Sequence, residues 1–265
     1  MVISFNGLGN EGRLGNQMFQ YAFLRGVAAN INSDWIIPPE DAQRYDNYGL
    51  YDCFVLKNCE EKNRGESNFN DHVYREMHFN ESVFNWNQGD VNFSGNFQSE
   101  RYFENIIEQI REDFTFNDDY LKPCQEYINS IGGRDENIFL HVRRGSPNLT
   151  GRRGEKWSYQ MIQEYHPLCK KDYYLKALEH FPDKKVIVVS DTIDWCKEQD
   201  WLQDDRFLFS DSSYETFGDG ASVPYIDLCL MSLCGGAIIA NSSLSWWGAW
   251  LQNNTGKVIA PDPWF

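Results

Sequence analysis

The sequence predicts an α/β protein in which parallel strands alternate with helices. Short β-branched runs alternate with stretches whose apolar residues recur at helical spacing, and the alternation is most regular in the second half of the chain. A strand, a crossover helix and a further strand form right-handed parallel units, with helices on both faces of the sheet. At 265 residues the chain is long enough for one large domain or for two lobes.

The first half of the chain contains one clear strand followed by a helix. The expected elements are a strand at 2–5, a helix from Asn16 to about Ala29, a strand at 91–95 and a helix at 99–111. A glycine-spaced loop, residues 7–15, connects the first two. Residues 39–90 are polar and aromatic without a steady period, so no element is assigned to them.

The second half of the chain carries five short apolar runs separated by helical patterns. The expected strands are 137–142, 185–190, 206–209, 236–240 and 257–260, and the expected helices are 172–181, 224–234 and 243–251, with a further one starting at Asp191. The double glycine at 132–133 is the best boundary between two lobes. We therefore expect lobes at 1–132 and 133–265.

The charge balance limits the class of partner. The chain has 24 Lys and Arg against 39 Asp and Glu, a formal net charge of −15. Nucleic acids and anionic membranes require a broad basic face, which so acidic a protein does not offer. A local basic pocket for a small anion remains compatible with this charge.

The cysteines and the ends of the chain suggest an intracellular protein. The seven cysteines are odd in number, scattered, and without a CxxC pair, so neither a disulfide framework nor a structural zinc is expected. The sequence has no signal-peptide pattern and no apolar run near the roughly 20 residues of a membrane span. We expect a cytoplasmic protein, at most peripheral to a membrane, whose oligomeric state the sequence leaves open.

A basic island follows the strand expected at 137–142. Residues 141–156 contain five cations and one acid, namely Arg143, Arg144, Arg152, Arg153 and Lys156 against Glu155. Adjacent residues of an extended chain point in opposite directions, so one of the first two arginines can enter a cleft while the other pairs with a structural carboxylate. The planar guanidinium fork matches phosphate oxygens. A diphosphate site and a pair of surface arginines are the two interpretations.

Polar residues also follow three other expected strands. They are the loop 7–17, the pair Ser190 and Asp191, and the hydroxyl-rich stretch 241–245 at the start of a helix. Ligands of parallel sheets bind beyond the carboxyl ends of the strands. The stretch 241–245 either caps its helix or also contacts an anion. Asp191 either caps a helix or accepts bonds from a ribose or a guanine edge, and the loop is either a flexible turn or part of a cleft.

Several other chemistries have no support in the sequence. The glycines of the loop 7–17 fit neither the dinucleotide fingerprint nor the P-loop. No histidine has ligand spacing with a nearby Cys, Asp or Glu, so no metal site is expected. There is no G-x-S-x-G elbow for a hydrolytic triad.

Five blocks of the sequence together resemble a known family. They are LGNQMFQYAF near the start, FSGNFQSERYF in the middle, HVRRG, VVSDTIDWCKE, and LMSLCGGAIIANSSLSWWGAWL near the end. In this order they resemble the bacterial α-1,2-fucosyltransferases. The resemblance implies a two-lobed GT-B fold with Rossmann-like lobes and a cleft between them. It also implies inverting transfer of L-fucose from GDP-β-L-fucose to the 2-hydroxyl of a terminal galactose in a glycan, with no required metal or other cofactor.

The resemblance assigns roles to residues of each matching motif. The arginines of H-x-R-R, Arg143 and Arg144, fall on the donor-phosphate positions and are the candidate catalytic residues. The expected donor-binding residues are His141, Ser190, Asp191, Asn241, Ser242, Ser243 and Ser245, together with Gly15, Asn16 and Gln17 of the first lobe. The first lobe is expected to bind the acceptor and the second to bind GDP-fucose.

The sequence departs from the family pattern at two places and does not identify the general base. Several alternatives therefore stay open. Ser146 stands where the family usually has aspartate, and Gly235-Gly236 replaces a basic residue and a histidine. A non-catalytic or weakly active homologue that binds a sugar nucleotide or glycan is one alternative, and a transferase for another nucleotide sugar is a second. Asp191, Glu155 and Glu215 are candidates for the general base, and the sequence does not select among them.

Overall fold

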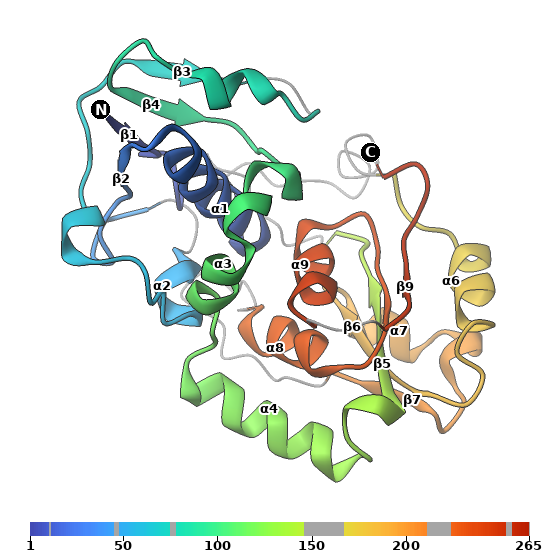
Figure 1. Cartoon of the computed structure of the whole chain (residues 1–265). Helices are drawn as coiled ribbons and strands as arrows, with labels where there is room; N and C mark the ends of the chain where they lie inside the picture. The colour runs from blue at the N-terminus through green and yellow to red at the C-terminus, as the bar shows by residue number, and fades with distance from the viewer. Residues whose placement is uncertain are drawn as a thin grey trace. The chain divides into compact units, whose positions relative to one another are not determined.

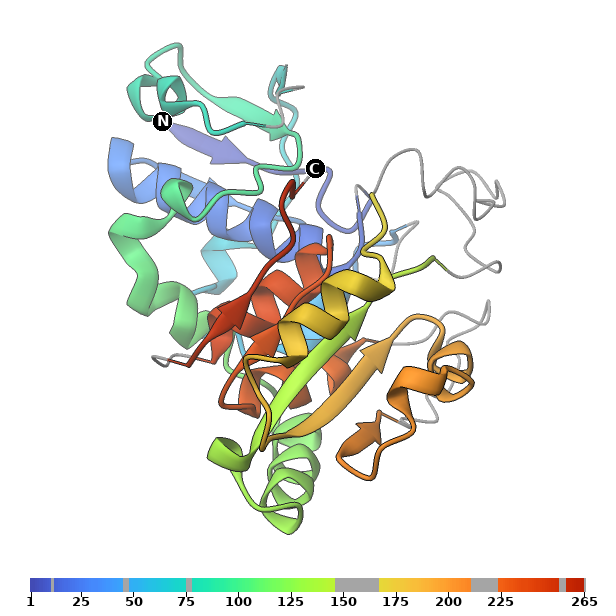
Figure 2. The same cartoon turned by 90° about the vertical axis from the view of Figure 1, so that its right-hand side faces the viewer.

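The chain divides into two compact units, Met1–Asn117 and Asp118–Phe265, which Figures 1 and 2 show from two sides. The structure, a computed structural model, describes residues 1–10, 12–44, 48–74, 78–145, 167–210, 224–252 and 256–264. Each unit contains one parallel sheet with helices, as the predicted α/β class requires. The division falls before the double glycine at 132–133, which lies inside the second unit.

The sheet of the first unit has four short parallel strands in the order β2-β1-β4-β3. Their bounds are Val2–Ser4 for β1, Asp34–Ile36 for β2, Asp71–Val73 for β3 and Val91–Ser94 for β4. The strands β1 and β4 confirm the predictions at 2–5 and 91–95. The strands β2 and β3 were not predicted, and they form the two edges of the sheet.

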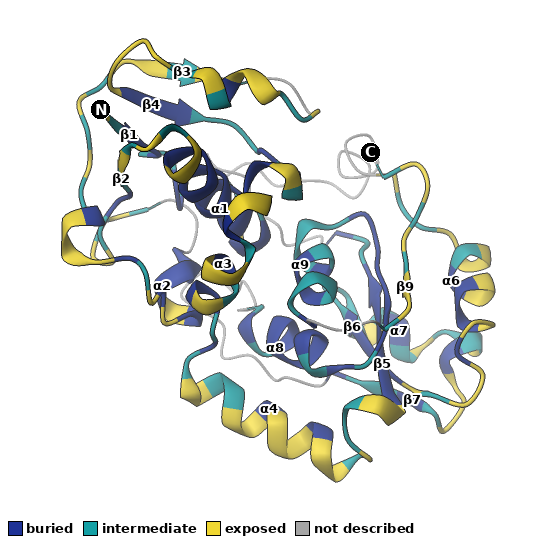
Figure 3. Ribbon diagram, in the orientation of Figure 1, coloured by how far each residue is buried: buried dark blue, intermediate teal, exposed yellow. Residues whose placement is uncertain are grey.

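Helix α1, Leu14–Ile31, is the central helix of the first unit and is buried along most of its length (Figure 3). It confirms the helix predicted at 16–29. Its C-cap residue is Asn32, whose φ of 51° lies in the left-handed region that asparagine tolerates at a helix end. Gly26 lets another segment approach closely, since a Cβ atom there would lie 2.1 Å from the carbonyl oxygen of Tyr102.

The remaining helices of the first unit are short. They are α2 Gly49–Cys53, α3 Ile107–Asp113, and the 3-10 turns η1 Glu61–Asn63, η2 Glu81–Asn85, η3 Glu100–Tyr102 and η4 Glu104–Ile106. The helix predicted at 99–111 is therefore divided into η3, η4 and α3. Phe103 and Ile106, with φ of −133° and −136°, interrupt the helical backbone.

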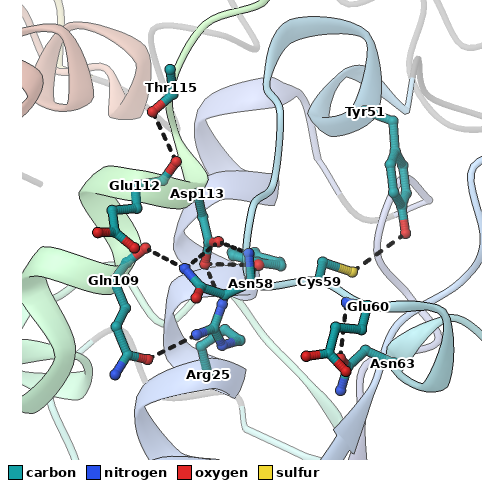
Figure 4. A network of polar contacts seen from close by, with 11 residues as sticks. Arg25, Tyr51, Asn58, Cys59, Glu60, Asn63, Gln109, Glu112, Asp113 and Thr115 are labelled. Atoms are coloured by element: carbon teal, nitrogen blue, oxygen red, sulfur yellow. Dashed lines mark hydrogen bonds and ion pairs between the residues drawn. The ribbon is translucent and has the colours of Figure 1, made fainter.

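A buried polar network ties α1 to α3 (Figure 4). Arg25 of α1 forms an ion pair with Asp113, and the Tyr21 hydroxyl donates to the same carboxylate at 3.0 Å. The other carboxylate oxygen accepts from the backbone and side-chain nitrogens of Asn58, at 2.6 and 2.9 Å. Because both charges are buried and each finds a partner, the network holds these segments in one arrangement.

The sheet of the second unit has five parallel strands in the order β7-β6-β5-β8-β9. Their bounds are β5 Asn137–Val142, β6 Lys185–Ser190, β7 Phe207–Phe209, β8 Ala237–Ile238 and β9 Val258–Ile259. All five strands predicted from the sequence are present. The central strand β5 is buried at every position, which explains its continuous apolar run.

Helices cover both faces of this second sheet. They are α4 Asp118–Ser130, α6 Lys171–Leu178, α7 Ile193–Lys197, α8 Tyr225–Leu233 and α9 Ser243–Leu251, with the 3-10 turns η5 Arg134–Glu136 and η6 Asp200–Leu202. One core joins α6 and α7 to β5 and β6 through residues such as Leu140, Tyr174 and Cys196. Helices α8 and α9 lie on the opposite face of the sheet from α6 (Figure 2).

Two further findings concern the cysteines and the membrane. All seven cysteines are free thiols, and only Cys169 is not fully buried. Within the described part of the chain, no helix is both long enough and apolar enough to cross a membrane.

Candidate functional site

Three of the four predicted polar stretches meet at the edge of the second sheet that is formed by the carboxyl ends of its strands. The strands β6, β5 and β8 are neighbours and run parallel, so residues 143–145, 190–192 and 241–245 follow their carboxyl ends side by side. This edge is where parallel sheets bind ligands. The fourth stretch, 7–17, follows β1 and belongs to the first unit.

The carboxylate of Asp191 organises the loop after β5. It forms an ion pair with Arg143 and accepts hydrogen bonds from the backbone N–H groups of Arg144, at 3.0 Å, and Gly145, at 2.8 Å. Gly145 has a φ of 87°, which places it in the left-handed region. The N-cap position of α7 is Thr192, so Asp191 holds the neighbouring loop rather than capping that helix.

The two candidate catalytic arginines have different surroundings. Arg143 is the one that pairs with a structural carboxylate, that of Asp191. The guanidinium of Arg144 instead lies over the ring of Trp195 in α7, with Cζ 3.7 Å from the ring centroid. Stacking engages the face of a guanidinium, while hydrogen bonds are made by the N–H groups at its edge. The indole therefore fixes the plane in which Arg144 presents these donors.

His141 is a neutral side chain with an unsatisfied ring nitrogen. It lies in β5 and is only 3% exposed. Burial lowers its pKa to about 4, with Asp191 opposing the shift and Arg143 adding to it. Its Nδ1 atom has no hydrogen-bond partner among the described residues. Buried polar atoms are normally paired, so this nitrogen is an exception among the described residues.

The stretch after β8 divides into structural residues and residues at the helix start. Ser245 is fully buried and its hydroxyl donates to the carbonyl oxygens of Ala240 and Ser242, at 3.3 and 3.2 Å, so it shapes the turn. Asn241 donates to the carbonyl of Pro167 at 2.6 Å, while its Oδ1 has no partner within the described part of the chain.

The start of α9 supplies groups that attract an anion. Ser242 is the N-cap residue and Ser243 the first helical residue, and both are partly exposed. The first N–H groups of a helix have no partner within the helix and carry a partial positive charge. Because α9 begins beside the loop that carries the arginines, both can act on one anionic group.

The predicted donor-binding residues of the first unit lie in the first turn of α1. Gly15 and Gln17 are buried, and Gln17 donates to the carbonyl of Gly12 at 3.0 Å. Asn16 is partly exposed and accepts a hydrogen bond from Gln98 at 2.9 Å. Gln17 thus holds the glycine-rich loop in shape, and Asn16 is the more accessible of the three.

Trp195 was not among the site residues predicted from the sequence, and several of the predicted candidates lie outside the described residues. Trp195 stands four residues after Asp191 within the block VVSDTIDW, but nothing in an isolated sequence indicates that it stacks on Arg144. Ser146, Arg152, Arg153, Glu155, Lys156 and Glu215 lie outside the described residues. Among the described residues, no group of three or more His, Cys, Asp or Glu side chains is arranged to hold a metal ion.

Comparison with known proteins identifies the family. The model of glycosyl transferase family 11 matches residues 3–265. The chain belongs to this family. The match covers almost the whole chain. The resemblance to the α-1,2-fucosyltransferases is therefore confirmed at the level of the family.

Individual relatives and solved structures refine this placement. An α-1,2-colitosyltransferase of Escherichia coli is 31% identical over 281 residues, covering 96% of this chain and 90% of the relative. Galactoside α-(1,2)-fucosyltransferase 1 of Homo sapiens is 25% identical over 267 residues, covering 94% of this chain and 66% of the relative. The crystal structure of POFUT1 in complex with GDP-fucose superposes with a TM-score of 0.53 at 11% identity, covering 98% of this chain and 97% of that one. This last likeness supports the GT-B-like fold alone.

Proposed function

We propose that this family 11 glycosyltransferase transfers L-fucose from GDP-β-L-fucose to the 2-hydroxyl of a terminal galactose in a glycan. Membership of the family and the name of the human relative support the α-1,2 linkage and the galactoside acceptor. The observation that carries the proposal is the convergence of Arg143, Arg144 and the start of α9 at one edge of the second sheet. Such a set of donors suits a diphosphate.

The proposed reaction is a single displacement at C1 of fucose. The galactose hydroxyl forms the new C–O bond as the bond from C1 to the diphosphate breaks, and the hydroxyl proton passes to a base. A β-linked donor then gives an α-linked product. Negative charge grows on the departing GDP, where the guanidinium groups and helix N–H groups stabilise it. Loss of one such donor typically slows the reaction about a hundredfold.

The surroundings of Asp191 favour a supporting role over that of general base. Three donors already occupy its carboxylate, one of them the charged Arg143. A base must have an oxygen available to the acceptor hydroxyl in the reacting complex. We therefore propose that Asp191 positions Arg143 and the loop backbone, and we assign no residue to the base.

A GDP-release assay with GDP-fucose and a panel of galactose-terminated acceptors, followed by linkage analysis, tests the proposal. We expect GDP release that depends on the acceptor and an α-1,2-fucosylated product. We also expect unchanged rates in EDTA, and Arg144→Ala should slow turnover at least about a hundredfold without altering the circular dichroism of the protein. Binding of GDP-fucose without acceptor-dependent release would show a non-catalytic homologue instead.

The colitosyltransferase relative favours a second candidate donor. Colitose is fucose without its 3-hydroxyl, so GDP-colitose would use the same diphosphate site. The bacterial relative is 31% identical and covers 96% of this chain. A site that hydrogen-bonds the 3-hydroxyl would reject the deoxy sugar strongly, whereas an apolar site would not. A larger kcat/KM with GDP-colitose than with GDP-fucose would establish the second candidate.

A further inference from the structure

A pocket lies beside the edge strand of the first sheet. Its volume is about 460 Å³, within the roughly 300–1,000 Å³ of typical ligand pockets. The described residues that line it come from β3, from η2 and from the segments next to them: His72, Val73, Tyr74, Asn80, Ser82, Asn85, Trp86 and Gln88. Within the described residues β3 is the last strand on its side of the sheet (Figure 1), so the pocket residues of β3 belong to an edge strand.

One part of the lining is a wall of aromatic rings. The ring of His72 packs edge to face against Tyr74 and Trp86, with centroids 4.8 Å apart in both pairs. Behind them, the buried ring of Phe93 contacts Trp86 at 5.6 Å. The indole Nε1 of Trp86 donates to the carbonyl of Gly89 at 2.9 Å, which fixes the ring. These ring contacts and the hydrogen bond of Trp86 therefore fix the positions of the aromatic side chains.

The other part of the described lining consists of polar, uncharged side chains. The side chains of Asn80, Ser82, Asn85 and Gln88 provide hydroxyl and amide groups, which both donate and accept hydrogen bonds. None of the described lining residues is Asp, Glu, Lys or Arg. A nucleotide or phosphate would require cationic partners, so the chemistry of the lining fits a neutral ligand with many hydroxyl groups.

We propose that this pocket binds a neutral saccharide and is a glycan-recognition site of the first unit. The apolar C–H face of a sugar ring would pack on Trp86 or Tyr74, and its hydroxyl groups would bond with the amides of Asn85 and Gln88. The identity of the saccharide, a galactose-terminated oligosaccharide, rests on the proposed function. The pocket itself stands on the geometry of the first unit.

Asn85 and Asn87 provide a matched pair of variants. Both are exposed asparagines directly adjacent to Trp86 in the sequence, but only Asn85 lines the pocket. We expect Asn85→Ala and Gln88→Ala to weaken the binding of a galactose-terminated pentasaccharide about fivefold each, the effect of one lost hydrogen bond. Asn87→Ala should bind like the wild type. The affinities would be measured by ligand-observed NMR titration of the full chain.

The outcomes separate this proposal from the proposed function. Equal affinities of Asn85→Ala and Asn87→Ala, or no binding of the pentasaccharide by the wild type, would overturn the pocket assignment even if fucose transfer is observed. If the wild type transfers no fucose but Asn85→Ala loses affinity, the pocket stands and the proposed reaction fails. If both hold, Asn85→Ala should raise the acceptor KM about fivefold and leave the KM for GDP-fucose unchanged.

Discussion

The carboxylate of Asp191 shapes the loop that carries Arg143 and Arg144. The register of the second sheet pairs Val142 with Ser190, so the next residues on the two strands are Arg143 and Asp191. Their ion pair and the two backbone bonds to residues 144 and 145 follow directly from this register. The conformation of residues 143–145 therefore depends on Asp191, which directly follows the neighbouring strand β6.

Replacement of Asp191 by Asn tests this positioning role. The variant keeps an acceptor oxygen but loses the charge that holds Arg143, so we expect kcat/KM to fall about tenfold to a hundredfold. GDP affinity, measured by calorimetry, should fall as well. Asp194→Asn, at an exposed position in the same segment, is the control and should be unaffected. Reduced thermal stability with normal GDP affinity would indicate a purely structural role.

Because of His141, the stability of the second unit should depend on pH, and this dependence can be measured. Its pKa of about 4 in the folded protein lies below the roughly 6.5 of an unfolded chain, because burial disfavours the charged form. The unfolded state therefore binds more protons between pH 4 and 6.5. Stability is present above this range and decreases as the pH falls through it, by up to about 3 kcal/mol.

The measurement compares the wild type with His141→Gln in denaturant titrations from pH 7 to pH 4. The variant lacks the titrating group, so the difference in unfolding free energy between the two proteins should change across this window, with the wild type losing more stability. Arg143 and Asp191 face the imidazole and remain in both proteins. Parallel stability curves would show that His141 does not titrate as its burial implies.

At the scale of elements, the contact of α1 with the turn η3 depends on a glycine. Gly26 of the helix lies so close to Tyr102 and Phe103 that a Cβ atom would be 2.1 Å from the Tyr102 carbonyl oxygen and 2.7 Å from the Phe103 Cα atom. Both contacts are with backbone, which cannot rotate away as a side chain would. The close approach also coincides with the point where the predicted helix at 99–111 is interrupted.

Gly26→Ala should therefore destabilise the first unit although alanine favours helices. Relief of the clash requires movement of α1 or η3, and such overpacking typically costs about 1–3 kcal/mol. Gly65→Ala is the control, because no atom lies within 4 Å of the added methyl group there, and its effect should stay within about 0.5 kcal/mol. Urea denaturation provides both values, and equal stabilities of the two variants would refute the steric argument.

At the scale of the whole molecule, the two units differ in how far their sequences predict them. The strands β5 and β6 match the predicted ranges because long, buried β-branched runs have few other arrangements. Strand β3 has only three residues, Asp71–Val73, and among the described residues it pairs with β4 alone. A segment this short carries no periodic signal in its sequence. Its place in the sheet is decided by tertiary contacts.

The sequence predicted where the residues of the candidate site lie, but not which of them contact one another. Strand ends alone placed residues 143–145, 190–191 and 241–245 at one edge, because parallel neighbours expose their carboxyl ends together. That Asp191 would be the partner of Arg143 required the register between β5 and β6. That Trp195 would stack on Arg144 required the position of α7, which no local pattern provides.

A crystal structure of the protein with GDP-fucose tests the central claim most directly. The claim is that guanidinium groups and the start of α9 hold the departing diphosphate at the edge of the second sheet. We predict diphosphate oxygens within hydrogen-bond distance of the Arg144 guanidinium and of backbone N–H groups at residues 243–245. A diphosphate bound beyond hydrogen-bond reach of both would contradict the account.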